Sequence, residues 1–307
     1  MIADTSKLAR PVLKWAGGKT QLLNTFETYY RDLLKERNIK KYVEPFAGSG
    51  AVLFDIVQKY EIEEAYIWDI NPELYTVYEV IKRDVASLIS ILEKFELEFI
   101  PLDKEARKEY YYQIRQDFNS DLLEFDFRSY HEKKMIRAGQ FIFLNRTCFN
   151  GLFRVNKKGL FNVPIGDYKN PRICDEDNLQ LAHQFLQRVH IHLGDYRESR
   201  DVIDTETFVY FDPPYRPLNT SSSFTAYSKF DFTDKEQEEL ATYYRELHER
   251  GALLMLSNSD PKNVDEDDNF FDDLYEGFTI ERVSARRNIN SKGGSRGTIS
   301  ELLITNF

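Results

Sequence analysis

The chain has 307 residues, of which 42% are hydrophobic and 30% charged, with a formal net charge of −10. This size and apolar content predict a large α/β domain with a smaller second unit, and they exclude a largely disordered chain. No apolar run approaches the ~20 residues of a membrane span, and the N-terminus lacks a signal-peptide pattern. Cys148 and Cys174 have no metal-ligand spacing. We therefore expect a reduced cytoplasmic protein without a membrane anchor, a disulfide or a metal.

Basic residues are concentrated in two stretches despite the negative net charge. Residues 131–172 contain nine Lys and Arg against two acids, and residues 282–296 contain five and no acid. This segregation favours a phosphate-binding face, with the acidic remainder serving solubility. Two solvated basic surfaces are the alternative.

Seven short apolar runs predict the sheet. Five of them predict parallel strands buried on both faces, at residues 41–46, 64–70, 189–195, 208–212 and 251–259. The last two, FTIERVSA and TISELLITNF, flank a Gly-rich segment and predict an antiparallel pair that closes the sheet. Helical periodicity dominates between the second and third strands. We therefore predict a Rossmann-like α/β domain of residues 1–72 and 187–307, interrupted by a helical and hairpin domain of residues 73–186.

The N-terminal stretch PVLKWAGGKTQLL resembles a phosphate-binding loop only superficially. That loop requires a glycine five positions before Gly18, where this chain has Leu13. The spacing therefore excludes a phosphate-binding loop. Trp15 and Lys19 instead offer an aromatic face and a cation to another anionic or stacking partner, such as a carboxylate.

Gly48 and Gly50 lie in the turn between the first predicted strand and a helix. Glycines let the backbone approach a ligand closely, and the helix N-terminus offers unpaired N–H groups. Asp69 ends the next predicted strand, where an acid can accept hydrogen bonds from ribose hydroxyls. Leu53 replaces the third glycine of a dinucleotide fingerprint, so a nucleoside without pyrophosphate fits better. An ordinary strand-to-helix turn is the alternative.

The stretch FVYFDPPY, residues 208–215, ends a predicted core strand on an acid. Ligands of open parallel sheets bind at the carboxyl ends of the strands, where Asp212 is placed. Pro213 and Pro214 hold the next backbone extended, which makes the Pro213 carbonyl a fixed acceptor, and Tyr215 adds a flat ring. Two acceptors and a ring match a conjugated amino group on a planar base. A turn that is merely stiffened by proline is the alternative.

The combination of motifs resembles a known family. KWAGGK (14–19), EPFAGSG (44–50), a helical insert and DPPY (212–215) follow the order seen in Dam-type DNA adenine-N6 methyltransferases of the α group, the D12 class. NRTCFNGLFRVNKKGLFNVPIG (145–166) resembles their target-recognition hairpin, and NSKGGSRG (290–297) resembles their last loop. The similarity covers essentially the whole chain. It implies an S-adenosylmethionine-dependent methyltransferase fold with a helical target-recognition insertion, which methylates N6 of a flipped adenine in double-stranded DNA, in the sequence GATC.

The resemblance also implies three sets of residues. The catalytic set is Asp212, Pro213, Pro214 and Tyr215, with the flipped adenine lying on Tyr215. The S-adenosylmethionine set is Trp15, Ala16, Gly17, Lys19, Glu44, Pro45, Phe46, Gly48, Ser49, Gly50, Asp69, Ile70, Asp195, Tyr196 and Asp212. The DNA set is Lys14, Phe149, Asn150, Leu152, Arg154, Asn156, Lys157, Lys158, Pro164 and Tyr168.

Several of these residues have specific expected roles. Asp195 is placed to meet the cofactor's adenine, with a helix-capping acid as the alternative. Arg154 suits a bidentate contact to a guanine edge, with a phosphate contact as the alternative, and Phe149 suits a wedge in the base stack. Lys157 and Lys158 suit phosphate contacts.

Two rival functions remain at this level. One is a methyltransferase that acts on another planar amine or amide, such as an RNA base or a protein glutamine, although such enzymes more often have Asn where Asp212 stands. The other is a non-catalytic DNA-binding module. We expect a monomer, and the sequence does not separate a free-standing enzyme from the partner of a cognate restriction endonuclease.

Overall fold

A seven-stranded sheet forms the centre of the computed structural model, which describes residues 8–15, 17–120, 122–217, 232–286 and 298–307. The strands are β1 (Lys41–Glu44), β2 (Glu64–Asp69), β3 (Val189–Leu193), β4 (Thr207–Phe211), β5 (Leu253–Ser259), β6 (Thr279–Arg286) and β7 (Thr298–Thr305). The α-helices are α1 (Leu23–Glu36), α2 (Ala51–Lys59), α3 (Pro72–Arg83), α4 (Val85–Phe99), α5 (Lys104–Ser120), α6 (Glu132–Thr147), α7 (Glu176–Leu186), α8 (Asp234–Glu249) and α9 (Phe270–Leu274). Short 3-10 turns are η2 (Lys19–Gln21), η3 (Phe149–Gly151), η4 (Tyr196–Val202) and η5 (Pro261–Asn263).

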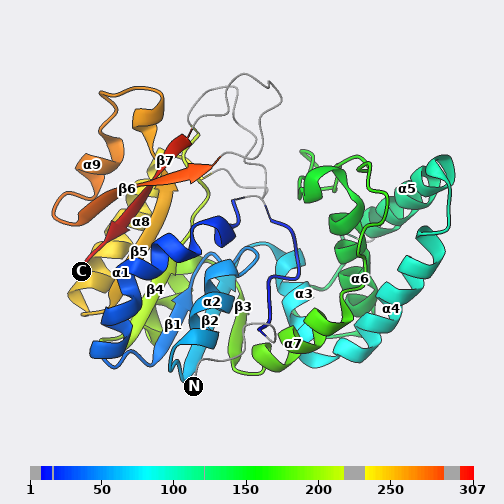
Figure 1. The fold of residues 1–307 in the computed structure, drawn as a ribbon, viewed down its shortest axis with the longest axis horizontal. Helices are drawn as coiled ribbons and strands as arrows, with labels where there is room; N and C mark the ends of the chain where they lie inside the picture. Colours follow the sequence, from blue (N-terminus) through cyan, green and yellow to red (C-terminus); the bar gives the residue numbers. More distant parts are fainter. Residues whose placement is uncertain (1–7, 16, 121, 218–231, 287–297) are drawn as a thin grey trace.

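The order of the strands creates a crevice at one edge of the sheet. The order is β3-β2-β1-β4-β5-β7-β6, with β1 to β5 parallel and β7 antiparallel to both of its neighbours (Figure 1). The predicted α/β sheet with its closing antiparallel pair is therefore confirmed. The chain runs outward from β1 to β3 and then returns to the other side of β1 as β4. This reversal brings the carboxyl ends of β1 and β4 side by side, where ligands of open parallel sheets bind.

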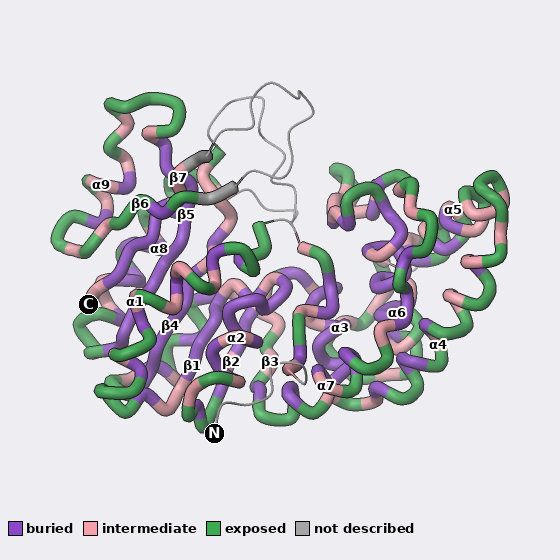
Figure 2. Tube along the Cα trace, in the orientation of Figure 1, coloured by how far each residue is buried: buried purple, intermediate pink, exposed green. Residues whose placement is uncertain are grey.

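Helices cover both faces of the central strands. Every residue of β4 and β5 is buried, as expected for strands without a solvent-exposed face (Figure 2). Alternate side chains enter two cores. Phe208 and Tyr210 pack with α1 and α2, whereas Val209 and Phe211 pack with η4, α8 and α9.

Helices α3 to α7 lie between β2 and β3 in the chain. In Figure 1, α4, α5 and α6 stand away from the sheet, and α3 and α7 lie between them and β3. The hydrophobic core beneath α1 and α2 continues without a break into these helices. The helical part is therefore packed against the sheet through a shared apolar interior.

Two buried ion pairs join α3 to α6. Arg137 donates from Nε to Glu73 at 2.8 Å, and both side chains are less than a tenth exposed. Lys134 is fully buried and pairs with Glu79. Arg146, which is partly buried, donates from Nη2 to the Val12 carbonyl at 2.6 Å. Lys134 and Arg137 are therefore not part of the expected phosphate-binding face, because the periodicity of α6 turns them inward.

The N-terminal segment, residues 9–14, runs along α2, α7 and α6 and buries the side chains of Ala9, Val12 and Leu13; we call it the strap. Side-chain amides hold it, each accepting from the backbone N–H and donating to the C=O of one strap residue at 2.8–3.0 Å. These pairs are Gln58 with Ala9, Asn178 with Arg10, and Asn145 with Lys14. The amides thus pair with backbone N–H and C=O groups of the strap, as the backbone of a neighbouring strand does inside a sheet.

Within the described ranges, no helix combines the length and the apolar character that crossing a membrane requires.

Replacing Arg137 with Met should destabilise the fold strongly, because it leaves the Glu73 carboxylate buried without its partner. The expected loss is about 3–5 kcal/mol in the free energy of unfolding, measured by urea denaturation. Lys104→Met is the control, because it breaks an ion pair whose side chains are 83% and 92% exposed. The control should cost less than about 1 kcal/mol. Equal losses in the two variants would contradict the importance of the buried pair.

Candidate active site and nucleic-acid interface

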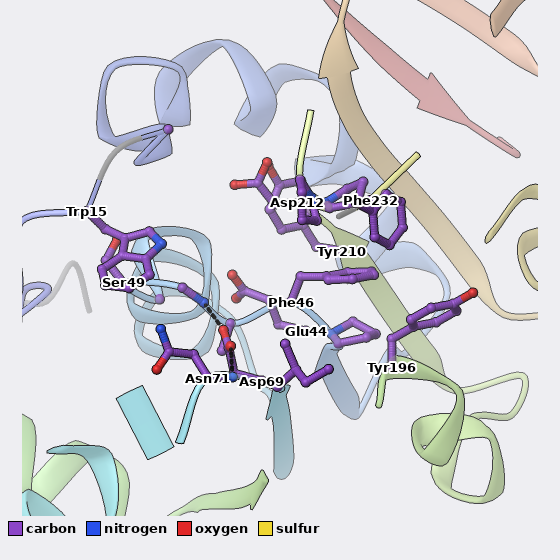
Figure 3. A pocket seen from close by; sticks show the side chains of 18 of the residues that line it. Trp15, Glu44, Phe46, Ser49, Asp69, Asn71, Tyr196, Tyr210, Asp212 and Phe232 are labelled. Atoms are coloured by element: carbon purple, nitrogen blue, oxygen red, sulfur yellow. Dashed lines mark hydrogen bonds between the residues drawn. The ribbon is translucent and has the colours of Figure 1, made fainter. Parts of the chain in front are cut away.

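A cavity of about 750 Å³ lies at the carboxyl ends of β1, β2 and β4. Glu44 ends β1, Asp69 ends β2, and Asp212 follows β4, so three acids reach the cavity from neighbouring strands (Figure 3). Parallel strands make this possible, because their carboxyl ends all lie on one edge of the sheet.

Asp212 is held by a cation and a hydroxyl. Lys19 Nζ lies 2.9 Å from Asp212 Oδ1, and Ser257 Oγ donates to the same oxygen at 3.0 Å. The hydroxyls of Tyr210 and Ser257 are 2.8 Å apart, which extends the network into the core. Lys19 is almost completely buried, so its charge is balanced mainly by Asp212. In this structure the anionic partner of Lys19 is thus a carboxylate of the chain itself.

The ring of Tyr215 lies next to the same ion pair. Lys19 Nζ is 4.5 Å from the ring centroid, a cation–π distance. Burial, with Asp212 and Glu301 nearby, raises the pKa of Tyr215 well above its ordinary value. The phenol therefore stays protonated and donates to Glu301 Oε2 at 2.8 Å, which holds the outer end of the side chain in place.

Two buried amides hold the backbone that follows Asp212. Gln237 Nε2 donates to the Pro214 carbonyl at 3.0 Å, and Asn258 Oδ1 accepts from the Arg216 N–H at 3.2 Å. The two amides also bond each other, from Asn258 Nδ2 to Gln237 Oε1 at 3.1 Å. Since both side chains are fully buried, the turn is clamped from β5 and α8 together.

The glycine turn after β1 is tied to the end of β2. Gly48 and Gly50 have φ of +49° and +70°, a conformation that side chains with a Cβ rarely adopt. Asp69 accepts from the Gly48 N–H at 2.9 Å and from the Asn71 N–H at 2.8 Å (Figure 3). Burial raises the pKa of Asp69 to about 6, and these two hydrogen bonds oppose part of that rise.

Glu44 adds a third acid deeper in the cavity. Burial raises its pKa well above the ordinary value, and Asp212 and Asp69 add to that effect, whereas a 2.7 Å hydrogen bond from Tyr42 opposes it. An acidic cavity of this kind favours a ligand with a positive charge.

Aromatic side chains form another part of the cavity lining. Phe46 and Tyr196 are stacked with centroids 5.1 Å apart, and Phe232 meets Phe46 edge-on at 5.9 Å. Ile70 is half exposed beside them. This part of the cavity suits a flat, weakly polar group.

Asp195 lines the cavity but makes local bonds. Its side chain accepts from the Arg197 N–H at 3.0 Å and pairs with the Arg197 guanidinium at 2.7 Å. It caps η4 in a reciprocal arrangement with Glu198. The capping role is therefore visible directly in the structure.

Trp15 connects the cavity with the loop after α6. Its ring stacks on Phe153 with centroids 5.5 Å apart and planes 20° apart. A Cβ at Gly48 would lie 3.2 Å from Trp15 Cδ1, so the indole also packs closely on the glycine turn.

The predicted hairpin after α6 is present as a narrow loop. Isolated antiparallel bridges join Cys148 to Ile165 and Val155 to Phe161. Phe149, at the base of this loop next to the Cys148–Ile165 bridge, is 51% exposed. The loop carries further predicted DNA contacts with exposed side chains, namely Asn150, Asn156, Lys157, Lys158 and Pro164.

Lys14 joins this group from the strap. Its ammonium lies 4.5 Å from the ring centroid of Tyr168. Burial first, and Arg146 second, lower the pKa of Lys14. The structure thus brings together predicted DNA contacts that are more than 150 positions apart in the chain.

Two predicted DNA contacts also have partners within the hairpin. Arg154 donates to the side-chain oxygen of Asn162 at 2.7 Å and to its carbonyl at 3.3 Å. Asn156 accepts from the N–H groups of Lys158 and Leu160 and so forms the turn. Asn156 therefore shapes the hairpin, and Arg154 is held across it.

In the second basic stretch, the structure describes the side chain of one of the five cations, Arg282. Arg282 pairs with Asp260 at 3.1 Å and with Asp272 at 2.8 Å, because the acidic segment before β6 folds back against it. Residues 287–297, which include the predicted last loop, lie outside the described residues, as does Ala16.

The cavity gathers the predicted catalytic and cofactor residues from five separate segments. Its lining includes Trp15, Gly17, Lys19, Glu44, Pro45, Phe46, Gly48, Ser49, Gly50, Asp69, Ile70, Asp195, Tyr196, Asp212, Pro213, Pro214 and Tyr215. Sequence reasoning missed the residues that support this set, namely Asn71, Gln237, Ser257, Asn258 and Glu301. The polar run Ser-Asn-Ser at the end of the apolar strand β5 was the available signal. In the part of the chain that the structure describes, no cluster of His, Cys, Asp or Glu is arranged to hold a metal ion.

Comparison with known proteins gives a consistent result. Residues 15–289 match the model of a family described as D12 class N6 adenine-specific DNA methyltransferase. A type II methyltransferase, M.MjaIII, of Methanocaldococcus jannaschii is 54% identical over 97% of this chain and 99% of its own length. DNA adenine methylases of Vibrio cholerae and of Escherichia coli K12 are each 34% identical over 97% of this chain, covering 96% and 95% of their own lengths.

The raised pKa of Asp69 should appear as a pH-dependent stability. Between pH 4 and 6 the native carboxyl binds a proton that the unfolded chain has lost. Wild-type stability should therefore fall relative to Asp69→Asn as the pH rises through this window, and the difference should level off above it. The expected change is about 2 kcal/mol, since the carboxyl keeps some contact with the open cavity. Urea denaturation of both proteins measures it, and a difference that is constant from pH 4 to 7 would contradict the raised value.

Proposed function

The chain belongs to the D12 class of N6 adenine-specific DNA methyltransferases, and on that premise we propose that it methylates adenine N6 in GATC sites of double-stranded DNA, with S-adenosylmethionine as the donor. Its mixed α/β fold is that of an S-adenosylmethionine-dependent methyltransferase. The observation that carries the proposal is the position of Asp212 and the following turn at the carboxyl end of β4, in one cavity with the glycine turn.

The cavity fits the proposed cofactor. S-adenosylmethionine combines a purine, a ribose and a positively charged sulfonium. Phe46 and Ile70 offer an apolar surface to the purine, Asp69 offers remaining lone pairs to the ribose hydroxyls, and the acids offer a negative environment to the sulfonium. Gly48 and Gly50 let this turn adopt positive φ next to the cavity. When bound, the cofactor supplies an electrophilic methyl group.

The Asp212 turn fits the amino group of an adenine. Asp212 and the Pro213 carbonyl are the two acceptors, one for each N–H of the amino group, and the Tyr215 ring supports the base plane. Drawing both hydrogens toward acceptors makes the nitrogen more pyramidal and its lone pair more available for attack. Lys19 and Ser257 fix the carboxylate, and Gln237 fixes the carbonyl side of the turn, so the acceptors are in place before the base arrives.

The helical part supports DNA recognition. We propose that residues 73–186 form the target-recognition domain and that residues 1–72 and 187–307 form the catalytic domain. Lys14, Leu152, Arg154 and Tyr168 then face base edges, Lys157 and Lys158 contact phosphates, and exposed Phe149 enters the base stack.

The cellular setting is proposed from the names of relatives. A type II methyltransferase name belongs to M.MjaIII and to a Lactococcus lactis relative. We propose that this chain likewise protects DNA beside a restriction endonuclease, acting as a cytoplasmic monomer. The adenine-specific family excludes the rival functions on RNA bases, protein glutamine or DNA binding without catalysis.

Asp212→Ala should lower kcat by at least about 100-fold, because it removes an acceptor of the amino group. Ser257→Ala removes one hydrogen bond to that carboxylate and should lower kcat by only about tenfold. Transfer of tritium from S-adenosylmethionine to DNA measures both, and calorimetry with the cofactor shows that each variant is folded. The role of Asp212 is wrong if the alanine variant keeps about a tenth of wild-type kcat.

Arg154→Ala should relax discrimination at one guanine of GATC, by about 1–3 kcal/mol. Lys157→Ala and Lys158→Ala should instead weaken methylation of all sites alike and flatten the salt dependence, as phosphate contacts do. Methylation rates on duplexes with GATC and its single-base variants separate these effects. If Arg154→Ala slows every duplex by one common factor, then the arginine contacts phosphate and does not read a base.

A further inference from the structure

Three side-chain amides hold the strap; Gln58 also donates to the Phe54 carbonyl of its own helix at 2.6 Å, whereas Asn145 also donates to the hairpin. Gln58 and Asn178 each bond the backbone of a single strap residue. Asn145 bonds the N–H and C=O of Lys14 at 2.9 and 2.8 Å, and its second N–H donates to the Gly151 carbonyl at 3.1 Å. Both donors and the acceptor of this amide are thus used, inside the fold, where the side chain is 1% exposed.

The bond to Gly151 joins two segments that are proposed to contact DNA. Gly151 ends η3 with φ +63°, next to exposed Phe149 and Asn150. A Cβ at Gly151 would lie 2.7 Å from Lys14 Cβ, so the lysine packs directly on the glycine backbone. The far end of the lysine meets the ring of Tyr168. Lys14 is therefore positioned between the beginning of the hairpin and the residues that follow it.

The same point of the chain leads into the active site. Trp15 follows Lys14 and packs between Phe153 of the hairpin and the Gly48 turn. Lys19, four residues later, pairs with Asp212. A displacement of the Lys14 backbone would therefore move a DNA-contacting side chain relative to the loop that carries the others.

We propose that Asn145 is a specificity-determining positioning residue, which fixes Lys14 and the Phe149–Gly151 turn as one rigid reading surface. It touches neither DNA nor the reacting atoms. This inference rests on the proposed function, since it needs Lys14 and the hairpin to contact DNA. The amide restrains the two segments relative to each other, because displacing either one would leave a buried N–H or C=O group without its hydrogen-bond partner.

The test compares Asn145→Ala with Asn178→Ala. Both changes remove a buried amide that bonds the N–H and the C=O of one strap residue, and only Asn145 also reaches the hairpin. The readout is the ratio of kcat/KM on the preferred duplex to kcat/KM on its single-base variants. Sequencing of DNA methylated by the wild-type enzyme defines the preferred duplex, so the comparison holds even if that site is not GATC.

Asn145→Ala should lower the discrimination ratio about tenfold at one base pair. Asn178→Ala should leave the ratio within about twofold of wild type while it lowers the thermal midpoint similarly. Gly151→Ala disrupts the contact between the hairpin and Lys14, because the added Cβ collides with the lysine side chain. It should therefore also lower the discrimination ratio. Calorimetry with S-adenosylmethionine shows which variants are folded.

Two results would overturn the proposal. One is an equal loss of discrimination in the Asn145 and Asn178 variants, which would mean that any loosening of the strap suffices. The other is a folded Asn145→Ala variant that methylates all duplexes more slowly by one common factor. If Asn145→Ala does not fold, the same result with a folded Gly151→Ala variant would overturn the proposal. A wild-type enzyme that methylates a site other than GATC would refute the proposed target sequence alone and leave this comparison intact.

Discussion

The buried pair of Lys19 and Asp212 is the interaction on which the arrangement of this molecule depends. A carboxylate at the end of β4 and an ammonium that is almost completely buried each need the other, because either charge alone would be poorly solvated there. The pairing requires the N-terminal segment to cross the crevice between β1 and β4. Once it does so, Trp15 is brought onto the Gly48 turn and Lys14 onto the hairpin.

The acids of the cavity show how three carboxyl groups are kept side by side in a buried site. Glu44 is hydrogen-bonded by Tyr42, Asp69 by two backbone N–H groups, and Asp212 by Lys19 and Ser257. Each carboxyl group is thus held by partners outside the space that a ligand would fill. Repulsion among the acids is offset locally, and the remaining negative potential is directed into the cavity.

The local pattern of apolar residues in the sequence was enough to predict the strands and the acids at their ends. Strands that are buried on both faces appear as continuous apolar runs, and each run stops at a polar residue where the strand reaches the edge of the sheet. Asp69 and Asp212 are of this kind. Pattern was not enough for Lys134 and Arg137, because a basic side chain on a helix looks the same in sequence whether it meets solvent or a buried acid on another helix. The partners Glu73 and Glu79 lie about 60 positions away in α3. Asn145 and Asn178 were missed for a similar reason, since their partners are backbone groups, which any residue has.

The α3–α6 ion pairs also constrain how this molecule can change over generations. A lineage that loses Arg137 is left with a buried charge at Glu73, and one that loses Glu73 first is left with the opposite charge. Either intermediate has a less stable fold than a chain with the original ion pair or one with a fully apolar pair of similar volume. Descendants should therefore keep both residues or replace both, and the two positions are inherited as a unit although they belong to different helices. The contact between α3 and α6 inside the helical part is thereby preserved, while the exposed hairpin beyond it is free to diverge.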